Sequence, residues 1–421
     1  MNDPLNRRKF ISTTALAGAA IAGAPMLHGQ SKLNGSSIKV AVIGCGGRGS
    51  GALANFMEAC KILGTKAEIV ALADAFDDRV SSLAKKHGVA KELQFTGYEA
   101  YKKALATDCE YVIMATPPGF RPVHFAAAID AGKHCFIEKP VAVDPVGSRA
   151  VMAAGEIAKK KGLGVVAGTQ RRHQKNYQTN KAKIDAGAIG EIRGGVVQWN
   201  GRIPWIKKRQ EGWSDNEYIT RNWLNFTELS GDHIVEQHVH NIDVAIWFLG
   251  RLPVSALGFG GRSRRVTGNQ FDFFSVDLNF GDDVHIHSQC RQLAGTYGRV
   301  GEMFTGTHGS CYGGGKMTGK DVSIAEIKLE SEHGMVQEHI DLITSVRAGK
   351  PRNEAQQIAE STLVAIMSRM SSYTGQMIRW VDVTENKRSP FYNYKCQVDP
   401  ITFETGSIKL PAEEPPIPGK A

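Results

Sequence analysis

The sequence predicts an α/β protein whose N-terminal part is a doubly wound parallel sheet. Residues 38–43 are apolar except for Lys39 and mostly β-branched, which favours a strand buried on both faces. This run breaks abruptly into glycines at Gly44, Gly46 and Gly49. From there to residue 170, short apolar runs alternate with amphipathic stretches. A parallel sheet covered by helices requires that alternation.

The glycines form a G-x-G-x-x-G loop ahead of a helix expected over 50–60. Such a loop makes a tight turn, leaves bare backbone beside which a pyrophosphate can lie, and aims helix N–H groups at that anion. We therefore predict that the whole loop binds a dinucleotide, through Gly44, Cys45, Gly46, Gly47, Arg48 and Gly49.

An acidic residue follows the second expected strand, 68–73. This residue, Asp74, can accept hydrogen bonds from the adenosine ribose hydroxyls and would repel a 2′-phosphate. An alternative role is to cap the helix expected over 77–86. Arg79 lies nearby and would suit the 2′-phosphate of NADP. We expect Asp74 to outweigh Arg79 in the choice of cofactor, so NAD is predicted and NADP is less favoured.

Later strands also end in polar residues. The strand expected over 110–115 ends in Thr116 and Pro117, and the strand over 133–137 ends in Glu138-Lys139-Pro140. Strand ends on one edge of a doubly wound sheet converge on the ligand crevice. The residues predicted to line it, besides the glycine loop and Asp74, are Thr116, Pro117, His124, Glu138, Lys139 and Gln170.

In this order, the glycine loop, Asp74, Thr116-Pro117 and above all Glu138-Lys139-Pro140 resemble the Gfo/Idh/MocA family. That family is named for glucose–fructose oxidoreductase, inositol dehydrogenase and rhizopine catabolism protein. The resemblance covers residues 37–385 and implies an NAD-binding Rossmann domain over 37–170. It also implies a C-terminal α/β domain over 171–385, with an open, mostly antiparallel sheet that often mediates oligomers. It would place Lys139 near the nicotinamide and the substrate hydroxyl, with Glu138 positioning the cofactor.

The second domain begins with a strand expected over 190–200, followed by a stretch dense in aromatic and polar residues. Indole and phenol rings beside arginine and asparagine suit a sugar, whose apolar faces stack on rings while its hydroxyls need polar partners. An alternative is a tryptophan-rich core or a subunit contact. The residues predicted to face the substrate are Arg171, His173, Tyr218, Arg221, Asn222, Trp223, His233 and Asp243.

The catalytic residues are expected within 230–243. The family pattern of an acid, three residues and a histidine becomes Glu236-x-x-x-His240 here, with glutamate in place of the commoner aspartate. On a helix these two side chains share one face. We predict that His240 takes a hydroxyl proton, that Lys139 shares or polarises it, and that Glu236 orients the imidazole. Extra histidines at His233 and His238 remain alternative bases.

No metal site is predicted, although histidines and acids are dense here. On a helix, His233 and His240 share a face that His238 does not, and a nicotinamide enzyme needs no Lewis acid for this step. His285 and His287 alternate along a strand-like run and are expected to be ordinary sheet residues.

Residues 1–32 are expected to be a twin-arginine signal peptide, cut between Ala24 and Lys32. Arg7 and Arg8 precede a short, weakly apolar run, and no lipid-attachment motif is present, so a membrane anchor is not expected. The +9 net charge is spread along the chain, which argues against a nucleic-acid partner. Seven cysteines without a CxxC pair do not suggest a disulfide framework.

These observations predict a periplasmic or secreted NAD-dependent sugar oxidoreductase that keeps its cofactor bound, because free dinucleotide is scarce outside the cytoplasm. An alternative is a glycoside hydrolase resembling the exported NAD-dependent α-N-acetylgalactosaminidases of this family. There, transient oxidation at C3 acidifies the C2 proton, the glycosidic oxygen is eliminated, water adds and the hydride returns. A second alternative is a non-catalytic sugar-binding protein with structural NAD. A homo-oligomer, dimer or tetramer, is expected, with residues 386–421 forming an extended C-terminal arm.

Overall fold

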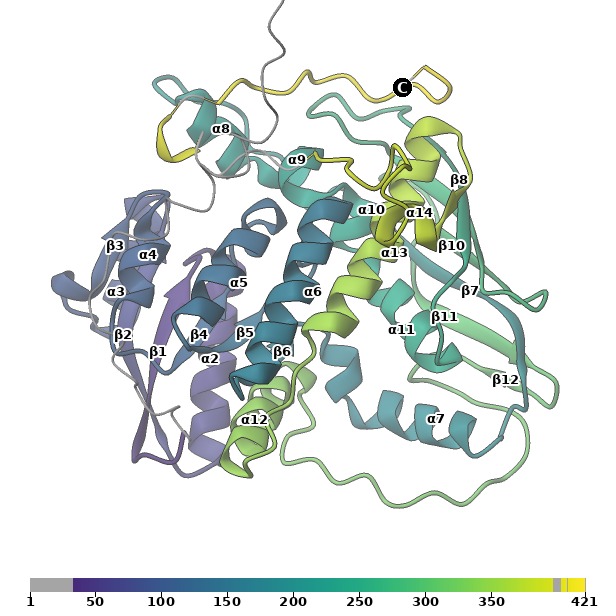
Figure 1. The fold of residues 1–421 in the computed structure, drawn as a ribbon, viewed down its shortest axis with the longest axis horizontal. Coiled ribbons are helices and arrows are strands. Elements are labelled where there is room, and N and C mark those ends of the chain that lie inside the picture. The colour runs from purple at the N-terminus through teal and green to yellow at the C-terminus, as the bar shows by residue number, and fades with distance from the viewer. Residues whose placement is uncertain (1–32, 397–402, 407, 421) are drawn as a thin grey trace, which may run out of the picture. The chain divides into compact units, whose positions relative to one another are not determined.

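The structure, a computed structural model, describes residues 33–396, 403–406 and 408–420 and contains two β-sheets (Figure 1). The expected signal peptide lies outside the described residues. Residues of the first sheet come from the N-terminal part of the chain, and those of the second sheet from the C-terminal part.

The first sheet has the order β3-β2-β1-β4-β5-β6 and is parallel throughout. Its strands are β1 (Ser37–Ile43), β2 (Lys66–Asp74), β3 (Gln94–Thr96), β4 (Tyr111–Met114), β5 (His134–Ile137) and β6 (Val165–Ala167). The order reverses at β1, so the loops after β1 and β4 diverge and leave a crevice at the carboxyl ends of these strands. The predicted doubly wound parallel sheet is confirmed.

Helices cover both faces of this sheet. They are α2 (Gly47–Ile62), α3 (Asp77–His87), α4 (Ala100–Leu105), α5 (Arg121–Asp130) and α6 (Pro145–Lys160). Alternate residues of β1 enter different cores: Val40 and Val42 pack on one face, Ala41 and Ile43 on the other. Burial on both faces explains why this strand is a continuous apolar run from Val40 onward.

Two helices from the C-terminal part complete the first domain. Helix α12 (Gly334–Arg347) lies beside α2, and its Leu342 and Ile343 join the core of Val40 and Val42. Helix α13 (Ala355–Thr374) packs along α6 and also against the second sheet. The two sheets are therefore joined by shared helices.

The second sheet has the order β12-β11-β7-β10-β9-β8-β13, in which only β7 and β10 are parallel neighbours. Its strands are β7 (Ile192–Gly201), β8 (Ser255–Gly261), β9 (Phe273–Asn279), β10 (His285–Gln292), β11 (Arg299–Gly306), β12 (Ser310–Cys311) and β13 (Ile378–Arg379). This confirms the expected mostly antiparallel sheet. On β10, His285 and His287 are exposed whereas Ile286 and Ser288 are buried, so the open face carries the two histidines.

Short helices connect these parts. The remaining elements are α7 (Lys175–Asp185), α8 (Asp215–Arg221), α9 (Thr227–Ser230), α10 (His233–Glu236), α11 (Val239–Leu249), α14 (Trp380–Thr384) and the 3₁₀ turns η1 (Lys91–Leu93), η2 (Pro118–Phe120), η3 (Gln170–His173) and η4 (Trp223–Asn225). The single helix that was expected to carry Glu236 and His240 is wrong: the chain breaks between α10 and α11 at Gln237 and His238.

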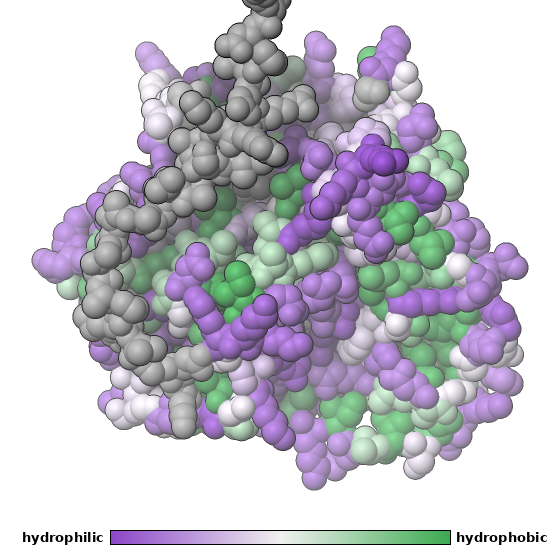
Figure 2. All heavy atoms as spheres, viewed as in Figure 1, coloured by the Kyte–Doolittle hydropathy of each residue, from purple (hydrophilic) through white to green (hydrophobic). Residues whose placement is uncertain are grey.

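No helix within the described ranges is long and apolar enough to cross a membrane. On the face shown in Figure 2, hydrophilic and hydrophobic residues are interspersed. All seven cysteines lie in described segments as free thiols, and only Cys396 is not fully buried.

Candidate active site

The glycine loop forms a bare cradle between β1 and α2. Gly44 has φ +97°, and a Cβ there would lie 2.7 Å from the backbone of Ala115. A Cβ at Gly49 would lie 1.7 Å from the carbonyl oxygen of Gly44. A Cβ at Gly47, by contrast, meets nothing within 4 Å. The loop is thus closed toward the protein and open at the N-terminus of a 16-residue helix, as binding of a pyrophosphate requires.

Asp74 ends β2 and faces the same opening. Its Oδ2 accepts a hydrogen bond from the N–H of Cys45 (2.8 Å), and its Oδ1 accepts one from the N–H of Phe76 (3.1 Å). Burial raises the pKa of Asp74, and Arg79 and the two N–H groups oppose that rise. The residue that precedes α3 is Phe76, so the alternative role of Asp74 as a helix cap is excluded.

A cavity of about 490 Å³ lies between the glycine loop and Asp74. This volume is in the usual range for small-molecule sites. Among its lining residues are Gly44, Gly46, Gly47, Arg48, Asp74, Arg79, Tyr98, Tyr101, Thr116, Pro117, Phe120 and His124. His124 Nδ1 lies 3.2 Å from Thr116 Oγ1, and burial lowers the pKa of His124 to about 3. The neutral ring therefore forms part of an uncharged wall.

Arg48 of the glycine loop is bonded both to Glu138 and to α12. Glu138 Oε1 pairs with Arg48 Nε, and its Oε2 accepts from the N–H of Lys139 (3.1 Å). Arg48 also reaches Glu338 (3.5 Å), a residue that the sequence reasoning missed. Burial raises the pKa of Glu338 well above its ordinary value, and His173 and Arg48 oppose the rise. Glu138 thus holds the start of α2 and the Lys139 backbone together.

Lys139 lies where the two domains meet. Its Nζ donates to the backbone oxygen of Glu236 (2.5 Å) and to Glu236 Oε1 (3.1 Å). Both side chains are mostly buried. In a continuous helix the Glu236 carbonyl would accept from the N–H of His240; instead that N–H bonds to Gln237 (3.4 Å). The break between α10 and α11 therefore leaves this carbonyl available to Lys139.

His240 stands in the first turn of α11. Its ring stacks on Trp199, with centroids 5.8 Å apart and planes 19° apart. Burial, then the charges of Lys139, Arg171 and Arg48, lower the pKa of His240 well below its ordinary value. The imidazole is therefore neutral, and one nitrogen of a neutral ring carries no hydrogen and can accept one.

Arg121 bonds to the backbone of the residue that follows Lys139, and the sequence did not identify it. Its guanidinium donates to the carbonyl oxygens of Pro140 and Thr116, the latter at 2.6 Å. The side chain is buried, and burial lowers the pKa of Arg121 to about 10 while Glu138 and Glu236 oppose the shift. Arg121 therefore ties together the chain segments that follow β4 and β5.

Arg171 lies within electrostatic reach of His240 and is paired with a carboxylate that the sequence reasoning missed. Its Nη1 pairs with Glu302 Oε1 (2.5 Å), and its guanidinium lies 5.9 Å from the Trp199 ring centroid. Asn241 also donates to Glu302 (2.7 Å). Gln170 begins η3 and does not line the cavity.

The two alternative bases have other partners. His233 is bonded through Nδ1 to Asp232 (2.8 Å), and its ring packs on Phe274. His238 Nε2 lies 2.8 Å from Ser288 Oγ, and burial lowers the pKa of His238 to about 3. Both are buried in the C-terminal core, so their predicted roles at the substrate are corrected to structural ones.

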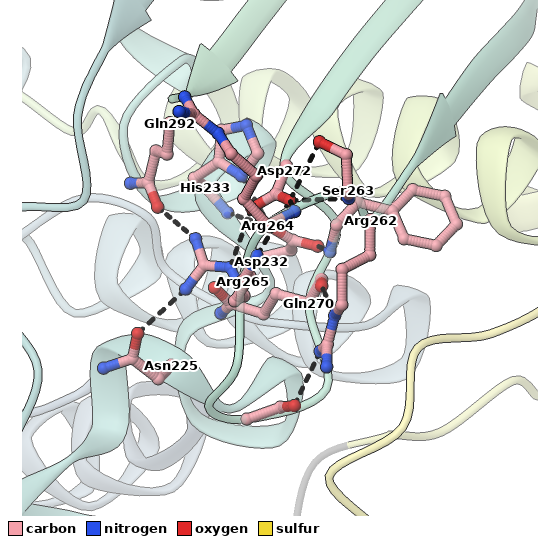
Figure 3. A network of polar contacts seen from close by, with 12 residues as sticks. Asn225, Asp232, His233, Arg262, Ser263, Arg264, Arg265, Gln270, Asp272 and Gln292 are labelled. Atoms are coloured by element: carbon pink, nitrogen blue, oxygen red, sulfur yellow. Dashed lines mark hydrogen bonds and ion pairs between the residues drawn. The ribbon is translucent and has the colours of Figure 1, made fainter. Parts of the chain in front are cut away.

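Figure 3 shows the buried polar network beside His233. Asp272 accepts hydrogen bonds from the backbone N–H groups of 263–265, and Arg265 donates to Gln292. Gln292 in turn donates to Gln237 (2.9 Å), the residue at the helix break. The network thus supports the break that exposes the Glu236 carbonyl.

Two further substrate predictions are also corrected. His173 is buried between Asp341 (2.5 Å) and Glu354 (3.5 Å). Asp243 accepts two hydrogen bonds from Arg172 (2.8 and 2.9 Å) and one from Ser361 (2.8 Å). Both side chains are occupied by protein partners that join elements of the core.

The aromatic stretch lies at the dinucleotide cavity and not beside Lys139. Arg221 and Trp223 line that cavity together with Asp74. Asn222 is buried and accepts from the N–H of Lys207 (2.9 Å), and Tyr218 donates to Glu413 (3.1 Å). Arg221 and Trp223 thus border a ligand cavity whereas Asn222 and Tyr218 are bonded to protein partners, and a contact of any of the four with the substrate stays a prediction.

Within the part of the chain that the structure describes, no three His, Cys, Asp or Glu side chains are grouped to hold a metal ion.

Two family profiles match this chain. An oxidoreductase family profile, NAD-binding Rossmann fold, matches residues 38–169, and the GFO/IDH/MocA C-terminal domain matches residues 177–312. Together they span more than half of the chain and agree with the two sheets. The protein belongs to the Gfo/Idh/MocA family of oxidoreductases.

Its relatives within that family differ in activity. A "Glycosyl hydrolase family 109 protein" of Shewanella pealeana is 25% identical over 312 residues, 65% of each chain. The "scyllo-inositol 2-dehydrogenase (NAD(+))" of Bacillus subtilis is 26% identical over 205 residues, 49% of this chain and 52% of that protein. The matches thus span about half to two thirds of these relatives. The crystal structure of myo-inositol 2-dehydrogenase from Lactobacillus plantarum has the same fold, with TM-score 0.63, 20% identity, and coverage of 82% of this chain and 99% of that one.

Proposed function

We propose that the protein is an NAD-dependent enzyme that oxidises a ring hydroxyl of a neutral sugar or glycoside. One observation carries this proposal. Lys139, which follows β5, bonds through Nζ to Glu236, and it lies within electrostatic reach of the buried, neutral imidazole of His240. Strand ends of this sheet form the ligand crevice, and the glycine cradle and Asp74 fit a dinucleotide. Bound NAD would supply the hydride acceptor.

His240, Lys139 and Glu236 each take a separate part in the proposed proton transfer. His240 accepts the hydroxyl proton, because its imidazole is neutral. Lys139 donates a hydrogen bond to the same oxygen and stabilises the negative charge that develops there. Glu236 holds the ammonium through both its carboxylate and its backbone carbonyl. Burial of these groups excludes water and strengthens each interaction.

The charge arrangement favours an uncharged substrate. Lys139 is paired with Glu236, and Arg171 is paired with Glu302. A carboxylate or phosphate on the substrate would have to displace one of these acids, whereas sugar hydroxyls can join the existing hydrogen bonds. Trp199, stacked on His240, offers an aromatic surface for an apolar sugar face.

A second candidate is a redox-assisted glycoside hydrolase, as weighed from the sequence. The match to the Shewanella pealeana protein favours it, because this match extends over 312 residues. Both candidates use the same hydride and proton transfers, and they differ in whether the hydride returns to the substrate.

The experiment purifies the protein without added NAD and offers it a panel of sugars and glycosides. Lasting reduction of the bound cofactor would support the oxidoreductase, and aglycone release without a lasting change in nicotinamide absorbance would support the hydrolase. Lys139→Ala and His240→Ala should each abolish turnover and retain NAD, whereas His285→Ala, on the open sheet face, should not change it. Full activity in the first two variants would refute the site, and sugar binding without turnover would support the non-catalytic alternative.

We also propose export by the twin-arginine route, which rests on Arg7 and Arg8 in the sequence. Replacing both by lysine should keep the protein in the cytoplasm in a cell-fractionation assay. Periplasmic protein at the original level would contradict this proposal.

We further propose that the open face of the second sheet forms a contact between copies of the chain. Leu257, Phe259 and Phe273 are exposed on neighbouring strands there. Grouped apolar side chains on a sheet face are typical of association surfaces. Light scattering should report a dimer or tetramer that Phe259→Lys weakens; a monomer in the unmodified protein would contradict this.

A further inference from the structure

The dinucleotide cavity has a wall that comes from the C-terminal domain. Besides the Rossmann residues, it is lined by Trp205, Lys207, Thr220, Arg221 and Trp223. Residues 205–223, which we call the cap, thus lie across the cavity from Asp74 and Tyr98. This side of the cavity holds the acid expected at the adenosine ribose, so the cap faces the adenosine half of the site.

The cap is joined to the Rossmann domain by specific contacts. Tyr98 Oη donates to the backbone oxygen of Asn216 (2.9 Å) and lies 3.1 Å from Thr220 Oγ1. Arg221 forms two hydrogen bonds with Asp78 (2.8 and 3.1 Å). Its guanidinium lies 3.9 Å from the centroid of the Phe76 ring. These contacts hold α8 over the β2–α3 connection.

Residues 403–406 and 408–413, which we call segment 403–413, pack on the cap and on the first domain beside it. Phe403 is 1% exposed and lies against the rings of Tyr98 (5.3 Å) and Phe120 (4.8 Å). Asn216 of the cap donates to the backbone oxygen of Phe403 (3.1 Å). In Figure 1 this yellow segment passes beside α8.

A second anchor lies further along this segment. Glu413 accepts from Tyr218 of the cap (3.1 Å) and from the N–H of Gly268 (3.0 Å). Glu404 pairs with Lys102 on the Rossmann side (3.0 Å). The segment therefore bonds to the cap, to the first domain and to the second domain.

We infer that the cap binds the adenosine half of the dinucleotide and that segment 403–413 locks the cap, so that the cofactor stays bound through many turnovers. This inference rests on the proposed NAD-dependent function and names the residues that retain the cofactor. Trp205 and Trp223 meet edge to face (5.9 Å, 70°) and are half-buried. Because the two indole rings are half-buried, each leaves part of its surface open for a purine to stack on. Lys207 and Arg79 add positive charge for the phosphates.

The arrangement of the cap slows release of the dinucleotide in addition to the dinucleotide's own binding contacts. A dinucleotide held by one domain can leave by breaking its own contacts. Here, release also requires the Arg221–Asp78 and Tyr98–Asn216 contacts to open, together with the Phe403 packing behind them. Such coupled opening acts mainly on the dissociation rate.

The test loads the full-length protein with isotopically labelled NAD and measures release into excess unlabelled NAD. Trp223→Ala removes a cap ring, Arg221→Lys keeps the charge but loses the two-pronged pair with Asp78, and Phe403→Ala loosens the lock. Each should speed release about tenfold or more, the loss of about 1.4 kcal/mol of contact. Tyr297→Ala, an aromatic residue that is 73% exposed in a loop of the second sheet, is the matched control and should leave release unchanged.

The outcomes separate this inference from the proposed function. If the unmodified protein binds no NAD, both are overturned. If it binds NAD and oxidises sugar, but all three variants release the label at the unmodified rate, only the cap inference fails. Circular dichroism of each variant identifies misfolding, and Arg221→Lys, the mildest change, decides the result if the alanine variants unfold.

Discussion

Asp74 and Arg79 stand together at the predicted ribose position, and we expect their opposite charges to set the choice between NAD and NADP. Both side chains line the cavity. The carboxylate favours ribose hydroxyls and opposes a 2′-phosphate, which the guanidinium would attract. We propose NAD, because the carboxylate is fixed by Cys45 and Phe76 at hydrogen-bonding distance.

Asp74→Asn tests this assignment. The amide removes the negative charge, so the ratio of NAD to NADP affinity should fall about tenfold, equivalent to about 1.4 kcal/mol. Titration calorimetry with both dinucleotides measures the ratio. Asp77→Asn, on the exposed start of α3, is the control. An unchanged ratio would show that Asp74 does not discriminate.

Arg121 holds the backbone around Lys139 in place by its bonds to the carbonyl oxygens of Pro140 and Thr116. Arg121→Met should lower kcat about 100-fold with a smaller change in KM, because a small shift of Lys139 disrupts the reacting geometry without removing a substrate contact. Arg149→Met is the matched control: Arg149 also donates to two backbone carbonyls, of Val383 and Tyr392. Loss of kcat in both variants alike would indicate a general packing effect.

At the scale of elements, the break between α10 and α11 leaves the Glu236 backbone oxygen free to bond with Lys139. It separates Glu236 and His240 at Gln237, yet Glu236 bonds to Lys139 and His240 stays within electrostatic reach of it. Buried polar bonds through Gln292 support that turn. A regular helix would have consumed the carbonyl that Lys139 now uses.

His173 links η3 to α12 and α13 as a buried charge. Burial opposes its protonation, but Glu354 and Asp341 raise the pKa of His173 to about 10. A raised pKa in the folded state stabilises the fold fully below the unfolded value of 6.5, and this contribution is lost as the pH rises through about 10.

His173→Gln should therefore reduce the free energy of unfolding by about 3–5 kcal/mol near pH 6, since two buried acids lose their cation. The difference from the unmodified protein should shrink toward pH 10. Denaturant unfolding at both pH values measures it, with exposed His333→Gln as the control. A difference that stays constant with pH would contradict the charged state of His173.

At the scale of the whole molecule, the two domains share their cores. Leu342 of α12 belongs to a C-terminal part of the chain but packs with Val40 and Val42 of the first sheet. Helix α13 contacts both α6 and the second sheet. We therefore expect the described part of the chain to unfold cooperatively, although the sequence divides it into two domains.

Leu342→Ala tests this coupling. The residue is fully buried, so the cavity should cost about 2–5 kcal/mol of unfolding free energy. The loss should be seen equally by probes of either domain during urea unfolding. Val266→Ala, at a side chain that is 86% exposed, should change stability by less than about 0.5 kcal/mol. Two separate transitions would contradict cooperative unfolding.

Local features of the fold were readable from the sequence. Strand β1, the glycine loop, Asp74 and helix α3, expected over 77–86 and observed at Asp77–His87, depend on periodicity and turn chemistry within a few residues. The end of an expected strand also marked Lys139, whereas Glu236 and His240 were identified through the resemblance to the family; the catalytic roles of all three remain predictions. The twin-arginine segment lies outside the described residues, and its role likewise remains a prediction.

Long-range partners were decided only by the tertiary structure. Arg48 meets Glu338 and Arg171 meets Glu302 across more than one hundred residues of sequence, and no local pattern encodes such pairings. The same holds for the tryptophan-rich stretch: its composition suggests a sugar site, but folding places it over the dinucleotide cavity. Residue type determines what a side chain can bind, whereas packing of distant segments determines what lies within its reach.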